Sequence, residues 1–490
     1  MNQSIIKYIL GKVLAIVGLL MAVPIVTGII YHEQETFAYV AVGVVSYLLG
    51  HFVSRKKPKN TVFYLKEGCV VTALSWILIS IIGAIPFMLT GEIPNFIDAM
   101  FETSSGFTTT GASILKDVEA LSHASLIWRS FTHWIGGMGV LVFLLAVIPM
   151  SGGSNINLMR AESPGPSVGK LVPKIRSSAS ILYRIYFGMT VVQIVLLIIA
   201  KMPVFDALCI TFGSAGTGGF GVRNDSCGSY TPLQQWITAI FFVLFGVNFN
   251  FYYYILAKDP KKSFRMEEVR AYFGIIAASV FLIFFNICGR FDTVSAALRA
   301  AFFQVGSIIT TTGYSTVDFN LWPTFSKAIL VLLMFIGACA GSTGGGFKVS
   351  RIIIAFKTFL KEANSYIHPK SVKKIKMDGE CVEHDVIRSV NVYMITYLTI
   401  FVLSVLLVSI EGKDLITSFT SVAATYNNIG PGLAEVGPAA NFDSLSYFSK
   451  IVLIFDMIAG RLELFPLLIL FHPAVLKDIF VKKKCSQSAK

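Results

Sequence analysis

Two short polar stretches interrupt an otherwise apolar chain, and their residues are suited to binding a dehydrated cation. They read TTTGAS at 108–113 and TTTGYS at 310–315. Backbone carbonyls in an extended turn of this kind can replace the water shell of a cation. Glycine permits the positive φ that points such carbonyls inward. The two stretches therefore predict an ion-binding turn that occurs more than once.

Two further copies emerge when the chain is aligned on the glycine that closes the turn. The four copies span 97–113, 205–221, 299–315 and 416–432, and only the glycine recurs in all four turns. The second and fourth turns read GTGG and NNIG, so the predicted ring departs from strict fourfold symmetry. The candidate ion-binding residues are Thr109, Thr110, Gly111, Thr217, Gly218, Gly219, Thr311, Thr312, Gly313, Asn428, Ile429 and Gly430.

The composition places these turns in a membrane protein. Of the 490 residues, 54% are hydrophobic and only 14% are charged, which is far too little charge to cover a soluble protein of this length. A bilayer-spanning helix needs about 20 apolar residues. Ten runs approach or exceed that length: 8–30, 36–53, 68–90, 126–149, 182–202, 234–257, 271–289, 326–357, 388–410 and 448–474.

Lysine and arginine concentrate in alternate loops between these runs. The basic loops include 151–184 and 357–388, whereas the intervening loops that carry the glycine turns hold few cations. Short basic loops remain on the cytoplasmic side. Both termini are therefore predicted to be cytoplasmic, and the net charge of +13 reflects membrane topology rather than nucleic-acid binding.

These patterns predict an all-α integral membrane protein of about ten spans with four re-entrant pore loops. Irregular backbone survives at membrane depth only where it is buried in protein or lines water, so four glycine turns should surround one pore. The short helix before each turn would direct its negative end toward the ion path. The predicted segments are two N-terminal helices (1–66), repeat 1 (67–180), repeat 2 (181–268), repeat 3 with a broken second helix (269–385), repeat 4 (386–476) and a cytoplasmic tail (477–490).

An acidic residue follows each glycine by five or six positions. These residues are Asp117, Asp225, Asp318 and Glu435. A carboxylate ring at the outer mouth would concentrate cations. The alternative is that each residue caps its own turn.

The eighth apolar run contains GACAGSTGGGFK at 337–348, and five glycines should unwind a helix there. A phosphate-binding loop would need a lysine directly after Gly346, where Phe347 stands instead. A glycine-rich seam for helix packing is the stronger alternative. Lys348, just after the glycines, could anchor the cytoplasmic end of this segment.

Arg461 lies near the middle of the last apolar run, where a charge is costly and is a functional candidate by default. The alternative is a structural ion pair with Asp456 or Glu463. Glu102 lies within the first pore segment, and we expect it to bind backbone N–H groups behind the turn. Arg129 and His133 are expected to hold helices together rather than to bind ions.

The chain resembles the TrkH family of potassium-uptake membrane subunits, within the wider Trk/Ktr/HKT superfamily, over nearly its whole length. The motifs that carry the resemblance, beside the four turns, are RSFTHWIGGMGVLVF (129–143), the segment 159–186 and GRLELFP (460–466). The resemblance implies four M1–P–M2 units, like a single-chain potassium channel. It also implies a bacterial inner-membrane location and potassium as the substrate, bound at the filter only. Serine in place of the first filter glycine accompanies sodium permeation in the superfamily, so Gly111 favours potassium.

The same resemblance implies a gate and partners. The glycine-rich segment would be a gating loop below the filter, formed by Gly341, Ser342, Thr343, Gly344, Gly345, Gly346 and Lys348, with Arg461 projecting into the ion path. TrkH-like subunits form homodimers on a ring of nucleotide-binding RCK subunits, TrkA. The basic segments 151–181 and 357–380 are the candidate docking surface, and their alternative role is contact with anionic lipid.

Other functions are less compatible with the sequence. A sodium or mixed sodium/potassium permease of the same superfamily is the main alternative. A membrane enzyme would need convergent titratable groups, and the chain contains no HExxH, GxSxG or paired-carboxylate constellation. Its seven cysteines form no CxxC pair, so neither a cofactor nor a resident metal is expected to bind this chain. Whether uptake is passive or coupled to a second ion, as in a symporter, is left open by the sequence.

Overall fold

The structure, a computed structural model, describes residues 1–58, 64–139, 175–257, 259–369 and 374–480. Helices dominate it, and one two-residue hairpin is formed by β1 (Lys376–Met377) and β2 (Glu380–Cys381). The α-helices are α1 (Gln3–Leu20), α2 (Ala22–Ile30), α3 (Thr36–Val53), α4 (Leu65–Thr90), α5 (Phe96–Phe107), α6 (His123–Gly137), α9 (Ile175–Ile199), α10 (Val204–Gly216), α11 (Pro232–Phe245), α12 (Phe249–Leu256), α13 (Pro260–Arg265), α14 (Glu267–Ile287), α15 (Val294–Ile309), α16 (Thr324–Ile336), α17 (Val349–Ile367), α18 (His384–Ser409), α19 (Leu415–Tyr426), α20 (Tyr447–Arg461), α21 (Phe465–Leu470) and α22 (Pro473–Phe480). Three short 3-10 helices complete the described elements: η1 (Cys288–Arg290), η2 (Phe319–Leu321) and η3 (Ala434–Val436).

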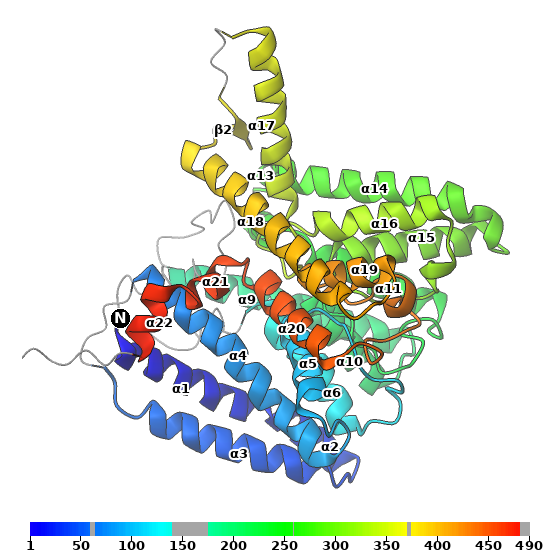
Figure 1. The fold of residues 1–490 in the computed structure, drawn as a ribbon. Coiled ribbons are helices and arrows are strands. Elements are labelled where there is room, and N and C mark those ends of the chain that lie inside the picture. The colour runs from blue at the N-terminus through cyan, green and yellow to red at the C-terminus, as the bar shows by residue number, and fades with distance from the viewer. Residues whose placement is uncertain (59–63, 140–174, 258, 370–373, 481–490) are drawn as a thin grey trace, which may run out of the picture.

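Four units of the same design make up most of the molecule. In each unit a short central helix packs against the helix before it and the helix after it: α4–α5–α6, α9–α10–α11, α14–α15–α16 and α18–α19–α20 (Figure 1). The last helix of each unit also contacts the central helix of the next unit, and α20 of the fourth unit returns to α5 of the first. The units therefore close into a ring, as the sequence predicts. The exact residue boundaries assigned to the repeats stay a prediction.

The central helices begin where short polar residues can cap them. Asn95 accepts hydrogen bonds from the backbone N–H groups of Ile97 and Asp98 at the start of α5. Thr293 and Asp414 cap α15 and α19 in the same way, whereas α10 begins after Pro203. Capping satisfies N–H groups that have no partner within the helix. All four helices end directly at the glycine turns.

The second long helix is interrupted in the second, third and fourth units. The glycine-rich loop, residues 337–348, separates α16 from α17, as predicted. The prediction of one broken helix was incomplete, because α11 and α12 are bent by 90° and Leu462–Leu464 separate α20 from α21. In the first unit α6 ends at Gly137, and the predicted continuation of this run to 149 lies outside the described residues beyond 139.

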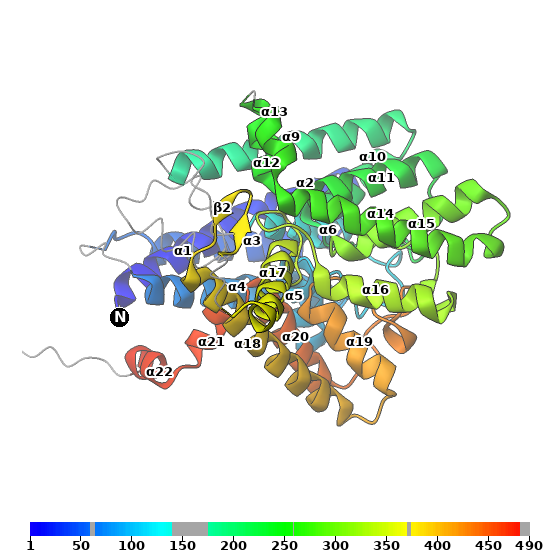
Figure 2. The same cartoon turned by 90° about the horizontal axis from the view of Figure 1, so that it is seen from above.

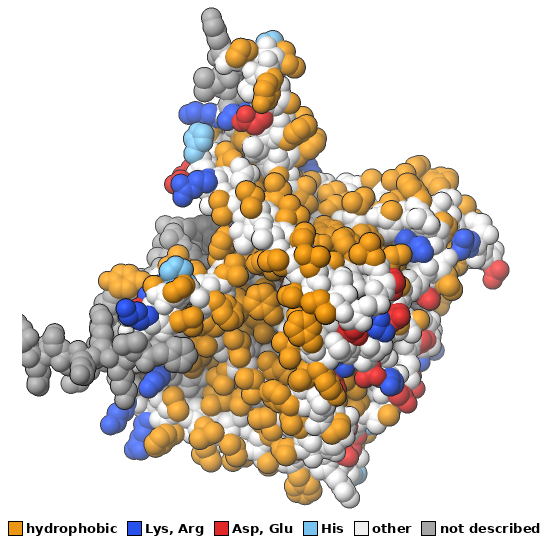
Figure 3. Space-filling view, viewed as in Figure 1, with side chains coloured by type: hydrophobic (Ala, Val, Ile, Leu, Met, Phe, Trp, Pro, Cys, Tyr) orange, Lys and Arg blue, Asp and Glu red, His pale blue; other side chains and the backbone are white. Residues whose placement is uncertain are grey.

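The surface fits a lipid environment. Six described helices are long and apolar enough to cross a membrane, or seven if the bent α11–α12 pair is one span. Large apolar side chains such as Phe37, Phe52 and Phe281 are exposed. In Figure 3 hydrophobic side chains cover the middle of the visible face, between an end rich in Lys and Arg and an end where Asp and Glu gather. An all-α multi-pass membrane protein is therefore confirmed.

The two N-terminal spans form a separate helical layer beside the first unit. α1 and α3 lie side by side (Figure 1, Figure 2), and Gly18 and Gly50 face backbone atoms of the opposite helix. A Cβ at Gly50 would come within 2.4 Å of the Ala15 backbone nitrogen. Small residues of this kind allow two membrane helices to pack at close range. Both helices also contact α4 and so attach the layer to the ring.

Candidate ion-conducting site

The four glycine turns (109–111, 217–219, 311–313 and 428–430) share one backbone conformation. The first residue of each turn is left-handed, with φ between 54° and 59°, although none of the four is glycine. The closing glycines also have positive φ, between 81° and 102°. In every copy the middle residue donates its N–H to the carbonyl five residues earlier, at 2.8–2.9 Å. A conformation that is costly for threonine and asparagine is thus repeated four times, which is typical of a functional site.

The closing glycines also show that the turns meet in a ring. A Cβ at Gly111 would come within 1.9 Å of the carbonyl oxygen of Gly218 in the second unit. A Cβ built on Gly219 would likewise lie 2.0 Å from the Thr312 oxygen in the third unit, and one built on Gly313 would lie 2.0 Å from the Ile429 oxygen in the fourth. Gly430 closes the ring on the first unit, with a wider distance of 2.9 Å to the Thr110 oxygen. The ring needs glycine at each junction because a side chain would displace a neighbouring carbonyl.

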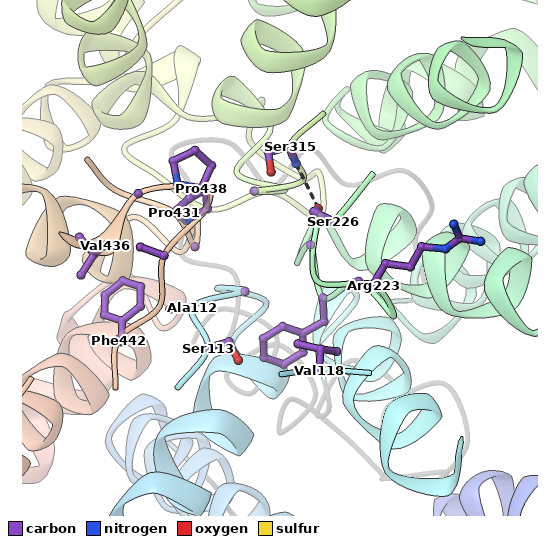
Figure 4. Close-up of a pocket in the computed structure, with 18 of the residues that line it drawn as sticks. Ala112, Ser113, Val118, Arg223, Ser226, Ser315, Pro431, Val436, Pro438 and Phe442 are labelled. Atoms are coloured by element: carbon purple, nitrogen blue, oxygen red, sulfur yellow. Dashed lines mark hydrogen bonds between the residues drawn. The ribbon is translucent and has the colours of Figure 1, made fainter. Parts of the chain in front are cut away.

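A second layer of hydrogen bonds joins the loops outside the turns. Asn224 accepts from the Val118 N–H at 2.8 Å and so links the second loop to the first. Ser226 Oγ accepts from the Ser315 N–H at 3.2 Å, the contact drawn as a dashed line in Figure 4. Asn320 bonds both backbone groups of Ala434, and the Phe442 N–H donates to the Ser113 carbonyl at 2.8 Å.

This outer layer surrounds a vestibule directly above the closing glycines. Its lining comes from all four loops, and the labelled side chains in Figure 4 surround the opening. Sequence reasoning missed the two asparagines that link the loops, Asn224 and Asn320. No pattern in the chain distinguishes them from ordinary loop residues, because their partners lie more than 100 positions away.

Charged and aromatic residues brace the first turn from behind. Glu102 accepts from the Ile114 N–H at 3.1 Å, as predicted, and also binds Arg129 at 2.7 Å in a fully buried ion pair. His133 Nδ1 lies 2.7 Å from the Gly106 carbonyl, while the Phe220 N–H donates to His133 Nε2 at 3.2 Å. A carbonyl can only accept and an amide can only donate, so the imidazole is neutral with its proton on Nδ1. It connects the first central helix to the second turn.

The glycine-rich loop lies directly beneath the turns. The Gly345 N–H donates to Thr311 Oγ at 2.6 Å, a direct bond between the loop and a turn. A Cβ at Gly345 would come within 2.6 Å of the Asn427 carbonyl, and one at Gly344 within 2.8 Å of the Thr310 carbonyl. Glycine therefore allows the loop to press against two adjacent units, which supports close approach rather than a helix-packing seam.

Three further residues of this loop that the sequence analysis names, Gly341, Ser342 and Thr343, each take part in a hydrogen bond. Gly341 has positive φ and its carbonyl accepts from the Phe249 N–H at 3.0 Å. Ser342 Oγ donates to the Cys339 carbonyl at 2.6 Å, and Thr343 Oγ donates to the Phe245 carbonyl at 3.2 Å. The bonds of Gly341 and Thr343 attach the loop to the bend between α11 and α12, whereas the Ser342 bond lies within the loop.

Lys348 and Gly346 lie at the end of the loop that leads into α17. Both have positive φ, and Lys348 is buried with its ammonium group bonded to the Gly344 carbonyl. The lysine thus folds back onto the loop. The prediction that it anchors this end of the loop stays a prediction.

Arg461 connects the loop to the opposite side of the ring. Its guanidinium donates to the Thr343 carbonyl and the Gly137 carbonyl, both at 2.8 Å, and to the Gly136 carbonyl. The two carboxylates considered as its partners bind elsewhere: Asp456 accepts from Ser404 Oγ at 2.7 Å, and Glu463 pairs with Arg351. The salt-bridge alternative for Arg461 therefore finds no support in these described contacts.

The four outer acidic residues bind groups of their own loops or of neighbouring loops. Asp117 accepts from Asn224 Nδ2 at 2.9 Å, Asp225 from Ser229 Oγ at 3.1 Å, and Asp318 from the Asn320 N–H at 2.9 Å. Glu435 pairs with Lys413 at 2.7 Å. None of the four is among the described residues that line the vestibule. The geometry thus favours contacts within and between the loops over a carboxylate ring.

Three predicted segments lie partly outside the described residues. The basic segment 151–181 and the motif 159–186 fall mostly within the gap between 139 and 175, and the segment 357–380 is described only outside 370–373. α17, which carries the first part of 357–380, projects away from the other helices (Figure 1).

A closed ring of carbonyl-bearing turns in an all-α membrane protein, with a loop directly beneath it, defines the class of ion-conducting membrane proteins. Comparisons with known proteins identify the family. The sequence model of the TrkH family, described as a cation transport protein, matches residues 35–482. The chain belongs to the TrkH family, as the motifs predict.

Named relatives are similar over their full length. The Trk system potassium uptake protein TrkH of Salmonella typhimurium is 35% identical over 490 residues, covering 98% of this chain and 100% of the relative. The potassium uptake protein TrkG of Escherichia coli strain K12 is 32% identical over 481 residues, covering 96% and 99%. The crystal structure of the potassium transporter TrkH from Vibrio parahaemolyticus superposes with a TM-score of 0.87 at 31% identity, covering 97% of this chain and 100% of that one.

Proposed function

We propose that this chain mediates potassium uptake across the bacterial inner membrane, with the four glycine turns as its selectivity filter. The observation that carries the proposal is the ring in which each closing glycine faces a carbonyl oxygen of the next unit. Rings of backbone carbonyls replace the hydration shell of potassium in known filters. The names of the TrkH and TrkG relatives support potassium as the ion.

The unpartnered hydroxyl of Thr109 adds support. Thr109 Oγ is buried and has no hydrogen-bond partner among the described residues, whereas Thr311 Oγ binds Gly345 and Asn428 Nδ2 binds Thr110 Oγ at 2.9 Å. Buried hydroxyl groups normally have a partner. A cation at the level of Thr109 would supply one.

We propose further that the glycine-rich loop and Arg461 form the gate. The loop contacts the third and fourth turns, and Arg461 holds its Thr343 carbonyl from below. A guanidinium at this position would repel a cation leaving the filter. Deleting part of 341–346 is therefore expected to raise potassium flux, and unchanged flux would contradict the assignment of the loop as a gate.

The assembly is a proposal as well. In the cell, both termini lie in the cytoplasm, two copies form a homodimer, and a TrkA-like RCK ring binds the basic cytoplasmic segments and supplies nucleotide control. The printed name of the relatives as Trk system proteins supports a multi-subunit system. The chain itself would carry potassium as its substrate and bind no other cofactor.

A mixed sodium/potassium permease is the second candidate, and one observation favours it. A Cβ built on Gly430 would lie 2.9 Å from the Thr110 oxygen, whereas a Cβ built on each of the other three closing glycines would lie 1.9–2.0 Å from a carbonyl oxygen of the next unit. The fourth turn thus approaches its neighbour less closely, and a looser ring would discriminate less between the two ions.

The direct test measures uptake of ⁸⁶Rb⁺ and ²²Na⁺ into liposomes that contain purified protein. Potassium uptake predicts rapid rubidium uptake and little sodium uptake, and comparable rates would establish the mixed permease. Gly111→Ser should raise sodium uptake relative to rubidium. If both fluxes are unchanged in that variant, the turns are not the filter.

A further inference from the structure

One buried carboxylate joins the two ends of the glycine-rich loop. Glu268 is the second residue of α14, the first helix of the third unit, and only 3% of it is exposed. Its Oε1 accepts from the Ala340 N–H at 2.6 Å and from the Ser350 N–H at 3.1 Å. Its Oε2 accepts from Asn248 Nδ2 at 3.3 Å, in the bend between α11 and α12.

The two N–H groups have few other possible partners. Ser350 lies in the first turn of α17, where backbone N–H groups lack partners within the helix. Ala340 lies in irregular backbone between α16 and α17. The two residues are ten positions apart, and the residues between them include all the glycines that touch the turns. This acceptor therefore adds to two backbone bonds that also hold the loop's ends together, from the Lys348 N–H to the Ile336 carbonyl at 3.0 Å and from the Val349 N–H to the Ala338 carbonyl at 3.1 Å.

The neighbouring residue, Glu267, is different. Its carboxylate is partly exposed and pairs with Lys357 on α17, and its N–H donates to Asp378 at 2.6 Å, next to the β hairpin. α14 and α17 are in contact where these bonds form (Figure 1). Glu267 thus binds α17 and the segment beside the β hairpin, while Glu268 binds the glycine-rich loop itself.

We propose that Glu268 is a positioning residue that holds the glycine-rich loop against the filter by closing its two ends on one carboxylate. The role of Glu268 in transport rests on the proposed gate, whereas its role in positioning the loop does not depend on that gate. Loss of the carboxylate leaves the Ala340 and Ser350 N–H groups without this acceptor and so loosens the loop, whereas an amide at the same position keeps an oxygen that can accept both N–H groups.

Cys339 provides a native probe of loop position. It is fully buried within the loop, and its N–H donates to the Gly246 carbonyl at 3.1 Å. Loss of a hydrogen bond to a charged acceptor shifts a local opening equilibrium by roughly tenfold or more. Glu268→Ala is therefore expected to speed modification of Cys339 by a small charged methanethiosulfonate by about tenfold or more.

Matched variants and internal references separate positioning from general damage. The reaction is followed by site-resolved mass spectrometry in the full-length protein. Glu268→Gln should leave Cys339 protected, and Glu267→Ala should also leave it protected, because it breaks only the Lys357 pair. Cys209 and Cys227, buried in the second unit, should stay unreactive in every variant. If Glu268→Ala does not fold, Glu268→Asp keeps the charge but withdraws the oxygens, and is expected to expose Cys339 as well.

Three outcomes would overturn the proposal. They are protection of Cys339 in both Glu268→Ala and Glu268→Asp, equal exposure in Glu268→Gln, and exposure in Glu267→Ala. Rubidium flux is measured separately on the same samples. If Cys339 becomes reactive but basal flux does not rise, Glu268 positions the loop and the gate assignment fails, so the two proposals are tested independently.

Discussion

Replacing Gly111 with alanine should weaken potassium binding and selectivity without unfolding the protein. Its φ of 81° costs a non-glycine residue about 1–2 kcal/mol. The larger effect is steric, because the new Cβ would lie 1.9 Å from the Gly218 oxygen, whereas real Cβ contacts under 3.0 Å essentially never occur. That oxygen would therefore have to move by more than about 1 Å, away from its place in the ring.

The magnitude follows from losing one carbonyl ligand. A hydrogen bond to a charged group contributes roughly 1.5–3 kcal/mol, and a similar loss for an ion–carbonyl contact weakens potassium binding by roughly 10- to 100-fold. Sodium should be affected less, because it is poorly matched to the intact ring, so the rubidium-to-sodium uptake ratio should fall.

Gly91 is a matched control. Its φ of 77° is almost the same, but nothing lies within 4 Å of a Cβ built there. Gly91→Ala carries the backbone strain without the clash, so its uptake ratio in the liposome assay should equal that of the wild type. The reasoning is refuted if Gly111→Ala keeps the wild-type ratio, or if Gly91→Ala loses it to the same degree.

Three further predictions concern the gate and the outer loops. Arg461→Ala should raise basal rubidium flux roughly 30-fold, since a unit charge about 8 Å from an ion contributes on the order of 2 kcal/mol at an effective dielectric of 20. Arg461→Lys keeps the charge and should keep most of the barrier. Equal basal flux in the two variants would argue against a charge effect. Thr311→Val removes the bond from Gly345 and should raise the loop-open population, read as basal flux, about fivefold for about 1 kcal/mol, while Thr311→Ser should not. Burial raises the pKa of Glu411, but the Ser449 hydroxyl and a backbone N–H that bond to it outweigh burial and hold its pKa below the usual 4.5. Its stabilisation is present above the unfolded-state pKa and is lost as pH falls through the lower folded-state pKa. The Tm difference between wild type and Glu411→Gln should therefore shrink as the pH falls below 4.5, and a constant difference would exclude this linkage.

Much of the architecture was accessible from the chain because its signals are local. Hydropathy predicted a multi-pass membrane protein, although six or seven described helices, and not ten, are long and apolar enough to span a membrane. The recurrence of one glycine identified four turns, and the orientation predicted from charge bias stays a prediction. The five glycines of 337–348 correctly predicted an unwound segment, because glycine is costly in a helix. The bend between α11 and α12 was missed, since a single glycine, Gly246, does not mark a break in a membrane helix, where glycine is frequent.

The sequence alone determined that this is a membrane protein with four related units, because apolar runs and recurring motifs can be recognised from residue types along the chain. Only the tertiary structure decided which groups meet. Asn428 reaches Thr110 across 318 positions, and Glu268 gathers donors from two distant segments. Such contacts depend on distance and direction in space, and residue type constrains neither. The same polar residue can cap its own turn, as Asp318 does, or hold a remote loop in place, as Glu268 does.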